Sequence, residues 1–143
     1  MEIKEIYAND DDKVMYLKGL IRLAKADGHV SAEEEDFFYN AAIGLGLQSD
    51  MATYLKALLK DNSIKAKDIS ISFDSKKKVL FFIRDAVQLC FMDGEYSQEE
   101  RNEIKSIGTE ADILNETITK IEEWVERGSN WRIEGDKLLE LED

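Results

Sequence analysis

Apolar residues recur every three or four positions along most of this chain, which is the spacing of one face of an α-helix. In the first half the chain shows three such stripes: Val14, Leu17, Ile21 and Ala24; then Phe37, Phe38, Ala41 and Leu45; then Tyr54, Leu55, Leu58 and Leu59. The 143 residues include no proline, a residue that breaks helix interiors. The pattern predicts an all-α protein.

The second half of the chain repeats the first. A shift of 66 residues aligns Leu23 with Leu89 and continues without a gap. Asp27, Gly28, Ser31, Glu33 and Glu34 then meet Asp93, Gly94, Ser97, Glu99 and Glu100. We therefore expect one helical bundle of about seven helices, built from two pseudo-repeated helix–turn–helix–helix units. The expected division of this single domain, residues 1–143, is repeat one at about 13–60, a linker at 61–75, repeat two at about 76–128 and a C-terminal tail at 129–143.

The repeated turns carry signals for ending one helix and starting the next. Gly28 and Gly94 stand where a left-handed residue closes a helix, and Ser31 with Glu34 and Ser97 with Glu100 have the spacing of capping boxes. By the same logic Gly108 is expected to end a helix. Thr109 with Asp112, and Ser49 or Asp50, are expected to cap the helices that follow.

Three further expectations concern packing. The stripe of Val79, Phe82, Ile83, Ala86, Val87 and Cys90 is so broad that its helix is expected to be central and buried. The linker stretch 69–73 alternates like a strand but has no partner strand, so we expect an extended connector on the surface.

Residues 132–141 are expected to form a short final helix, with Leu138, Leu139 and Leu141 on its apolar side. Trp124 is expected in the core, and Trp131 as a lid over the C-terminus.

The charge balance excludes some classes of partner. The chain has 19 Lys and Arg against 31 Asp and Glu, a net charge of −12, which disfavours nucleic acid and anionic membranes. Cys90 is the one cysteine, the N-terminus lacks the apolar run of a signal peptide, and the stretch 79–92 is too short to cross a bilayer. These features predict a cytoplasmic protein. Lys18, Arg22 and Lys25 are expected to lie near the acidic start of the next helix, Glu33–Asp36.

The motif Asp-Gly-x-x-Ser-x-x-Glu resembles the second half of an EF-hand loop. The first and third loop positions, however, are Leu23 and Lys25 in one copy and Leu89 and Phe91 in the other, and only side chains with oxygen serve there. Ordinary EF-hand calcium binding is therefore rejected. Two interpretations of the acidic residues remain open, helix capping alone or a weak divalent-cation site.

These residues resemble a known family. Ala24, Asp27, Gly28, Val30, Ser31, Glu33 and Glu34, followed by Ile43-Gly44-Leu45-Gly46-Leu47, are similar to the TerB-like family of tellurite-resistance proteins and to the N-terminal domain of the co-chaperone DjlA. The resemblance covers most of residues 13–126 and implies an all-helical fold with stress-response associations, cytoplasmic or peripheral to a membrane. It also implies binding of a divalent cation (calcium, magnesium or zinc), and the matching positions here are Asp27, Glu34, Asp93 and Glu100.

Signals for enzyme chemistry are poor. The chain has a single histidine, His29, so two-histidine metal motifs are absent, and Cys90 lies on an apolar stripe where an inert thiol is expected. We expect a non-enzymatic interaction module of the TerB type with a protein partner. The alternatives are a metal-independent adaptor or antagonist, and then a hydrolase using paired carboxylates.

Overall fold

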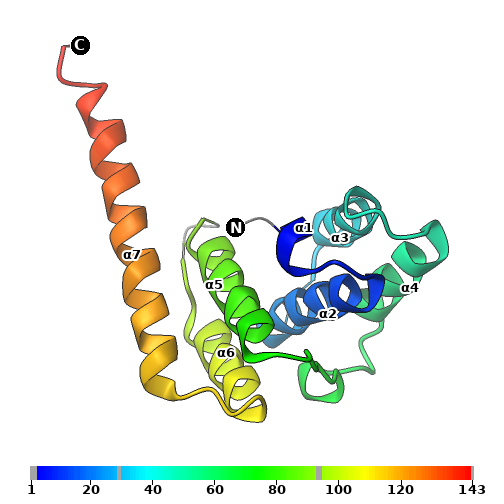
Figure 1. The fold of residues 1–143 in the computed structure, drawn as a ribbon. Coiled ribbons are helices and arrows are strands. Elements are labelled where there is room, and N and C mark those ends of the chain that lie inside the picture. The colour runs from blue at the N-terminus through cyan, green and yellow to red at the C-terminus, as the bar shows by residue number, and fades with distance from the viewer. Residues whose placement is uncertain (1–2, 29, 93–94, 143) are drawn as a thin grey trace.

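A computed structural model describes residues 3–28, 30–92 and 95–142. Its helices are α1 (Ile3–Ile6), α2 (Asp10–Ala26), α3 (Ala32–Gly44), α4 (Ser49–Lys60), the 3-10 turn η1 (Ala66–Asp68), α5 (Lys76–Met92), α6 (Gln98–Glu110) and α7 (Asn115–Leu138) (Figure 1). The described ranges contain no strand, which confirms the predicted all-α fold. Within those ranges, no helix combines the length and the apolar character that a membrane crossing requires.

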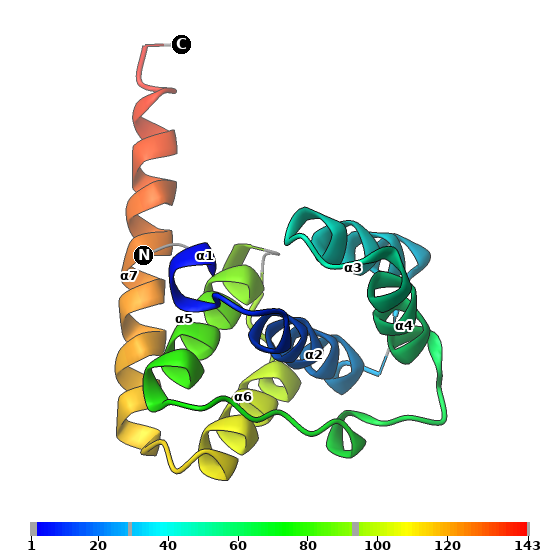
Figure 2. The same ribbon diagram turned by 45° about the vertical axis from the view of Figure 1, so that its right-hand side comes forward.

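Helix α2 occupies the middle of the bundle. It contacts α3 and α4 on one side and α5, α6 and η1 on the other, while α5 packs against α6 and α7 (Figure 2). The predicted broad stripe of α5 is buried, with Phe82 and Ile83 fully so. Gly19 of α2 faces Phe82: a Cβ at that position would lie 2.4 Å from Cζ of the ring. The helices α2 and α5 therefore approach one another closely because residue 19 has no side chain.

The N-terminal segment closes one side of this core. Tyr7 is fully buried, its ring stacks on Phe73 at 5.4 Å between centroids, and its hydroxyl donates to the Lys78 carbonyl at 2.9 Å. Tyr16 donates to the Asp85 carboxylate from α2 to α5. Burial and the nearby Asp85 both raise the pKa of Tyr7, so its hydroxyl stays a donor.

Both predicted capping boxes are present. The Ser31 hydroxyl accepts from the Glu34 N–H and the Ser97 hydroxyl accepts from the Glu100 N–H, each at 3.1 Å. Gly28 has φ +76°, the left-handed geometry predicted for it, whereas Gly94 lies outside the described residues. Local hydrogen bonding therefore determines where α3 and α6 begin.

Three predicted helix boundaries are wrong. Gly108 does not end α6 but is buried inside it, where an added Cβ would lie 2.5 Å from Cδ1 of Ile118. Its small size serves the contact between α6 and α7. The N-cap of α7 is Leu114 rather than Thr109 or Asp112, and the N-cap of α4 is Gln48, so that Ser49 is already helical.

The linker is not confined to the surface. Ile69 is buried, and Arg22 Nη1 donates to its carbonyl at 3.3 Å. Ile71 and Phe73 are half-buried against the core. The alternation along this stretch therefore places apolar side chains on the bundle without any partner strand.

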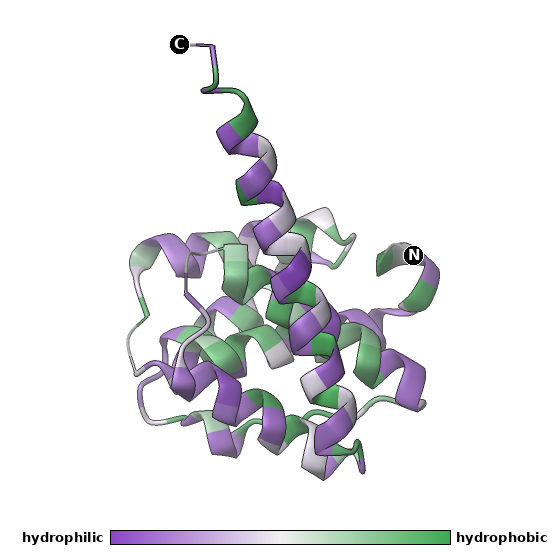
Figure 3. Cartoon of the chain, turned by 90° about the vertical axis from the view of Figure 1, so that its left-hand side faces the viewer, coloured by the Kyte–Doolittle hydropathy of each residue, from purple (hydrophilic) through white to green (hydrophobic). Residues whose placement is uncertain are grey.

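Helix α7 is longer and more exposed than the sequence predicted. It continues past residue 128 as far as Leu138, so residues 132–141 are no separate helix, and its last turns stand clear of the other helices (Figures 1 and 3). Trp124 is 47% exposed and Trp131 74% exposed, so neither is core or lid. An apolar pattern shows which face of a helix is apolar, but not whether another element covers it. We call residues 126–142 the α7 extension.

Candidate functional site

The turn that follows α2 and the start of α6 meet in space. Asp27 is the C-cap of α2 and Ser97 is the N-cap of α6. The Ser97 hydroxyl donates to Oδ1 of Asp27 at 3.1 Å, across 70 positions of sequence. Asp27 of the first motif is therefore held near Glu99 and Glu100 of the second.

A groove of about 510 Å³ opens beside this contact. Its apolar lining comes from α2, α3 and α5: Leu20, Leu23, Ala24, Phe37, Phe38, Ala86, Leu89, Cys90 and Met92. Its polar lining consists of Asp27, Ser31, Glu33, Glu34 and Glu100. We call it the acidic groove. Among the described residues no Lys or Arg lines it.

The carboxylates around the groove influence one another. Partial burial of the Asp27 carboxyl raises its pKa, and the negative charges of Glu100, Glu99 and Glu34 raise it further. The hydrogen bond from Ser97 acts in the opposite direction. An acid whose pKa is raised by its neighbours is held in a negative potential, and this potential attracts cations.

Lys18, Arg22 and Lys25 of α2 contact other elements, contrary to the expectation that they lie near the acidic start of α3. Lys25 Nζ donates to the carbonyls of Asp61 at 2.8 Å and Ile64 at 2.6 Å. Arg22 pairs with Glu103 and, at 2.9 Å, with Glu110. Lys18 lies over the ring of Tyr54, which is half exposed rather than inward as expected. Each base has a partner on α4, α6 or the linker, so the acidic start of α3 remains without them.

Three of the four candidate cation ligands, Asp27, Glu34 and Glu100, line this groove, while Asp93 lies outside the described residues. One oxygen of each glutamate is already engaged in its capping box: Oε1 of Glu34 accepts from the Ser31 N–H at 3.2 Å, and Oε1 of Glu100 from the Ser97 N–H at 2.9 Å. In the described part of the chain, no three carboxylate, thiol or imidazole groups are grouped closely enough to hold a metal ion.

Cys90 is buried in the lining of the groove, as its place on the α5 stripe predicted. His29 falls outside the described residues. The groove therefore combines carboxylates with apolar surface.

Comparison of the chain with known protein families, curated proteins and solved structures finds no match in any of the three.

Proposed function

We propose that this protein is a non-enzymatic interaction module whose acidic groove binds a basic, partly apolar segment of a partner protein. One observation carries the proposal: apolar side chains line the same groove as acidic residues from both Asp-Gly motifs, Asp27, Glu33 and Glu34 from the first and Glu100 from the second, and no described Lys or Arg lies among them. Arg and Lys match such a surface, because their alkyl stems cover apolar groups while their charged ends reach carboxylates.

The size of the groove supports a short segment. A volume of about 510 Å³ lies within the usual range for ligand sites and accommodates a few side chains. The exposed Phe37 and Met92 enlarge the apolar contact at its edges. The resemblance to the TerB-like family supports the same kind of role, with the two units as copies of one ancestor and a cytoplasmic stress-response or tellurite-resistance setting as part of the proposal.

A divalent cation is the second candidate ligand. The observation that favours it is the mutual influence of carboxylates from both motifs on the pKa of Asp27. In this version Asp27, Glu34, Asp93 and Glu100 supply oxygen ligands for calcium, magnesium or zinc. The cation would bridge the two turns, or link the protein to an acidic group of its partner.

The first candidate is tested with a fluorescent peptide of alternating Arg and Leu residues. The variant carrying Glu34→Gln and Glu100→Gln removes two charges while glutamine still completes each capping box. We expect its affinity to fall about tenfold or more, with a weaker dependence on salt. The matched control carries Glu116→Gln and Glu126→Gln, the same charge change at exposed positions of α7. Equal affinity of both variants, or no binding by the wild type, contradicts the proposal.

The second candidate is tested by thermal unfolding with calcium, magnesium or zinc. A cation that binds only the folded protein stabilises it by about 2.7 kcal/mol at one hundred times its dissociation constant. We expect the melting temperature to rise for the wild type and the control but not for the groove variant. A wild type that none of the three cations stabilises excludes the cation and leaves the peptide proposal intact.

A further inference from the structure

The α7 helix carries a regular stripe of alternating large and small residues. Trp124, Gly128, Trp131, Gly135 and Leu138 follow one another at spacings of four, three, four and three. This is the a/d spacing of a helix that packs against another helix in a coiled coil. Trp131 is 74% and Leu138 65% exposed, so the stripe lies uncovered in the described structure.

The two glycines make notches in this stripe. A Cβ built at Gly128 or at Gly135 meets no atom within 4 Å, so no neighbour among the described residues requires either position to be glycine. Glycine in a helix interior lowers helix stability relative to alanine. On this exposed face the large residues Trp131 and Leu138 can act as knobs, and Gly128 and Gly135 form the holes between them.

We propose that a second copy of this chain covers the stripe, with the two α7 extensions packed antiparallel about a two-fold axis. In this register Trp131 fits against the partner's Gly135, and Gly128 receives the partner's Leu138. These two layers each combine one large residue with one glycine, and the two-fold axis makes each contact twice. A parallel pairing would set Trp131 against Trp131 and leave the notches empty.

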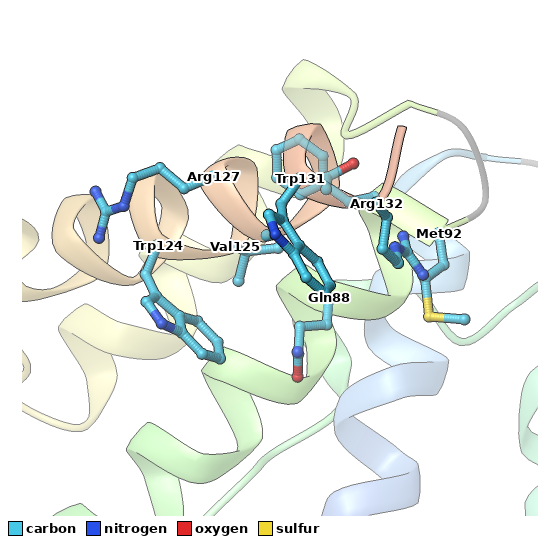
Figure 4. A pocket seen from close by; sticks show the side chains of 10 residues that line it. Gln88, Met92, Trp124, Val125, Arg127, Trp131 and Arg132 are labelled. Carbon is cyan, nitrogen blue, oxygen red and sulfur yellow. The ribbon is translucent and has the colours of Figure 1, made fainter. Parts of the chain in front are cut away.

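A hollow near the root of the extension fits the tip of the partner helix. It has a volume of about 450 Å³ and lies between α7 and the C-terminal end of α5, where Trp124 and Trp131 face Gln88 and Met92 (Figure 4). The antiparallel register brings the partner's Leu138, Leu139 and Leu141 to this place. These leucines are among the most exposed apolar residues of the chain, so the hollow gives them an apolar surface.

The distribution of charge along the α7 extension also favours antiparallel packing. The root of the extension, residues 126–132, has two bases, Arg127 and Arg132, against one acid, whereas residues 133–142 have four acids against Lys137. Antiparallel packing places the acidic tip of each copy beside the basic root of the other. In this register residue 133 meets its own counterpart at the axis, and Arg132 of each copy lies opposite Glu134 of the other. The acidic groove, lined by carboxylates, would repel the same tip.

The available surface is sufficient for a dimer. A buried tryptophan contributes on the order of 150–250 Å², and Trp124, Trp131 and the three leucines are half to four-fifths exposed. Covering them would bury roughly 600–800 Å² per copy, close to the ~800 Å² per partner of a standard interface.

The test is sedimentation equilibrium of the full chain from micromolar to near-millimolar concentration. We expect a monomer–dimer equilibrium in the wild type. Gly135→Leu fills the notch opposite Trp131 and should raise the dissociation constant about tenfold or more, since over-packing an interface is destabilising. The monomer itself should become more stable to heat, because leucine forms helix better than glycine. Asn130→Leu adds the same side chain off the stripe and should leave the dissociation constant unchanged.

Orientation is tested with a spin label at Glu126→Cys in a Cys90→Ala background. The antiparallel register centres the pair on residue 133, so the two labels lie seven residues to either side of the axis and roughly 21 Å apart along the helices. Parallel packing would bring the labels side by side. A wild type that stays monomeric, a Gly135→Leu variant that dimerises as well as the wild type, or adjacent labels would each overturn the proposal.

Discussion

The hydroxyl of Ser97 donates a hydrogen bond to the carboxylate of Asp27 at 3.1 Å, although 70 residues separate them in the chain. Ser97 performs two tasks at once, because its oxygen also accepts the Glu100 N–H and so starts α6. The end of one helix and the start of another are thereby joined by a single side chain. The first two predictions concern this contact.

Replacing Asp27 by Asn should change how stability depends on pH. The pKa of Asp27 is raised in the folded protein, so the folded state binds a proton more readily than the unfolded state, whose aspartate titrates near pH 3.9. The contribution of Asp27 to stability therefore falls as pH rises from the unfolded pKa through the folded pKa. Asparagine keeps the acceptor for Ser97 but does not titrate. We expect Asp27→Asn to gain stability relative to wild type between pH 3 and pH 7, measured by urea unfolding. A constant difference over this range would contradict the assignment.

Removing the Ser97 cap should lower the free energy of unfolding more than removing the Ser31 cap. Ser31→Ala removes one N-cap and should lower the free energy of unfolding by about 1 kcal/mol. Ser97→Ala removes an N-cap and the bond to Asp27, which adds roughly 0.5–1.5 kcal/mol. A double-mutant cycle with Asp27→Ala should show coupling to Ser97 and none to Ser31. Equal losses for the two serines would indicate that the contact with Asp27 contributes nothing.

Glycine-to-alanine substitutions at two helical positions should change stability in opposite directions. Gly19→Ala places a methyl group 2.4 Å from Cζ of the fully buried Phe82, and over-packing of this kind costs about 1–3 kcal/mol. Gly128→Ala meets no described atom within 4 Å and should stabilise the monomer by about 0.5–1 kcal/mol. Thermal unfolding at low protein concentration measures both. Stabilisation by Gly19→Ala would contradict the close approach of α2 and α5.

Arg22 should be among the least replaceable charged residues. It is 3% exposed, pairs with Glu103 and Glu110, and donates to the Ile69 carbonyl, so it fastens α2 to α6 and to the linker. Arg22→Ala leaves the partly buried Glu103 without this partner, and losing a hydrogen bond to a charged group costs about 1.5–3 kcal/mol. The double variant Arg22→Leu with Glu103→Leu should lose less, because it removes both charges. Denaturant unfolding that ranks the double variant below Arg22→Ala would refute this account.

The parts of the fold that depend on neighbouring residues in sequence were predictable. Ser31, Ser97 and Gly28 behave as their motifs predicted, because a helix start or stop is decided within a few residues. Gly108 and Trp131 were misjudged for one shared reason: the role of each depends on what lies opposite. Ile118 packs on Gly108, and no described element packs over Trp131.

Several residues of the groove were singled out from the sequence, but their assembly into one groove was not predicted. Asp27, Glu34 and Glu100 were identified from the repeated motif, and the structure places all three around one groove. The partners of Arg22 and Lys25 on α6 and in the linker lie far away in the sequence, so these contacts were not predicted. The segregation of bases and acids along residues 13–36 is the signal from which an uncompensated acidic surface could have been inferred.

The point at which α7 leaves the bundle divides the helix into two zones of hydrogen exchange. Up to Val125, which is buried, the backbone amides are protected by tertiary packing and open only when the core opens. Beyond it, in the monomer and within the described chain, a single helix of little more than a dozen residues has no tertiary support, and such helices are marginal in water. At protein concentrations low enough to keep the chain monomeric, amides after Gly128 should therefore exchange orders of magnitude faster than those before Val125. Trypsin should cut first at Arg127, Arg132 or Lys137, releasing the end of α7 while the remaining bundle stays folded.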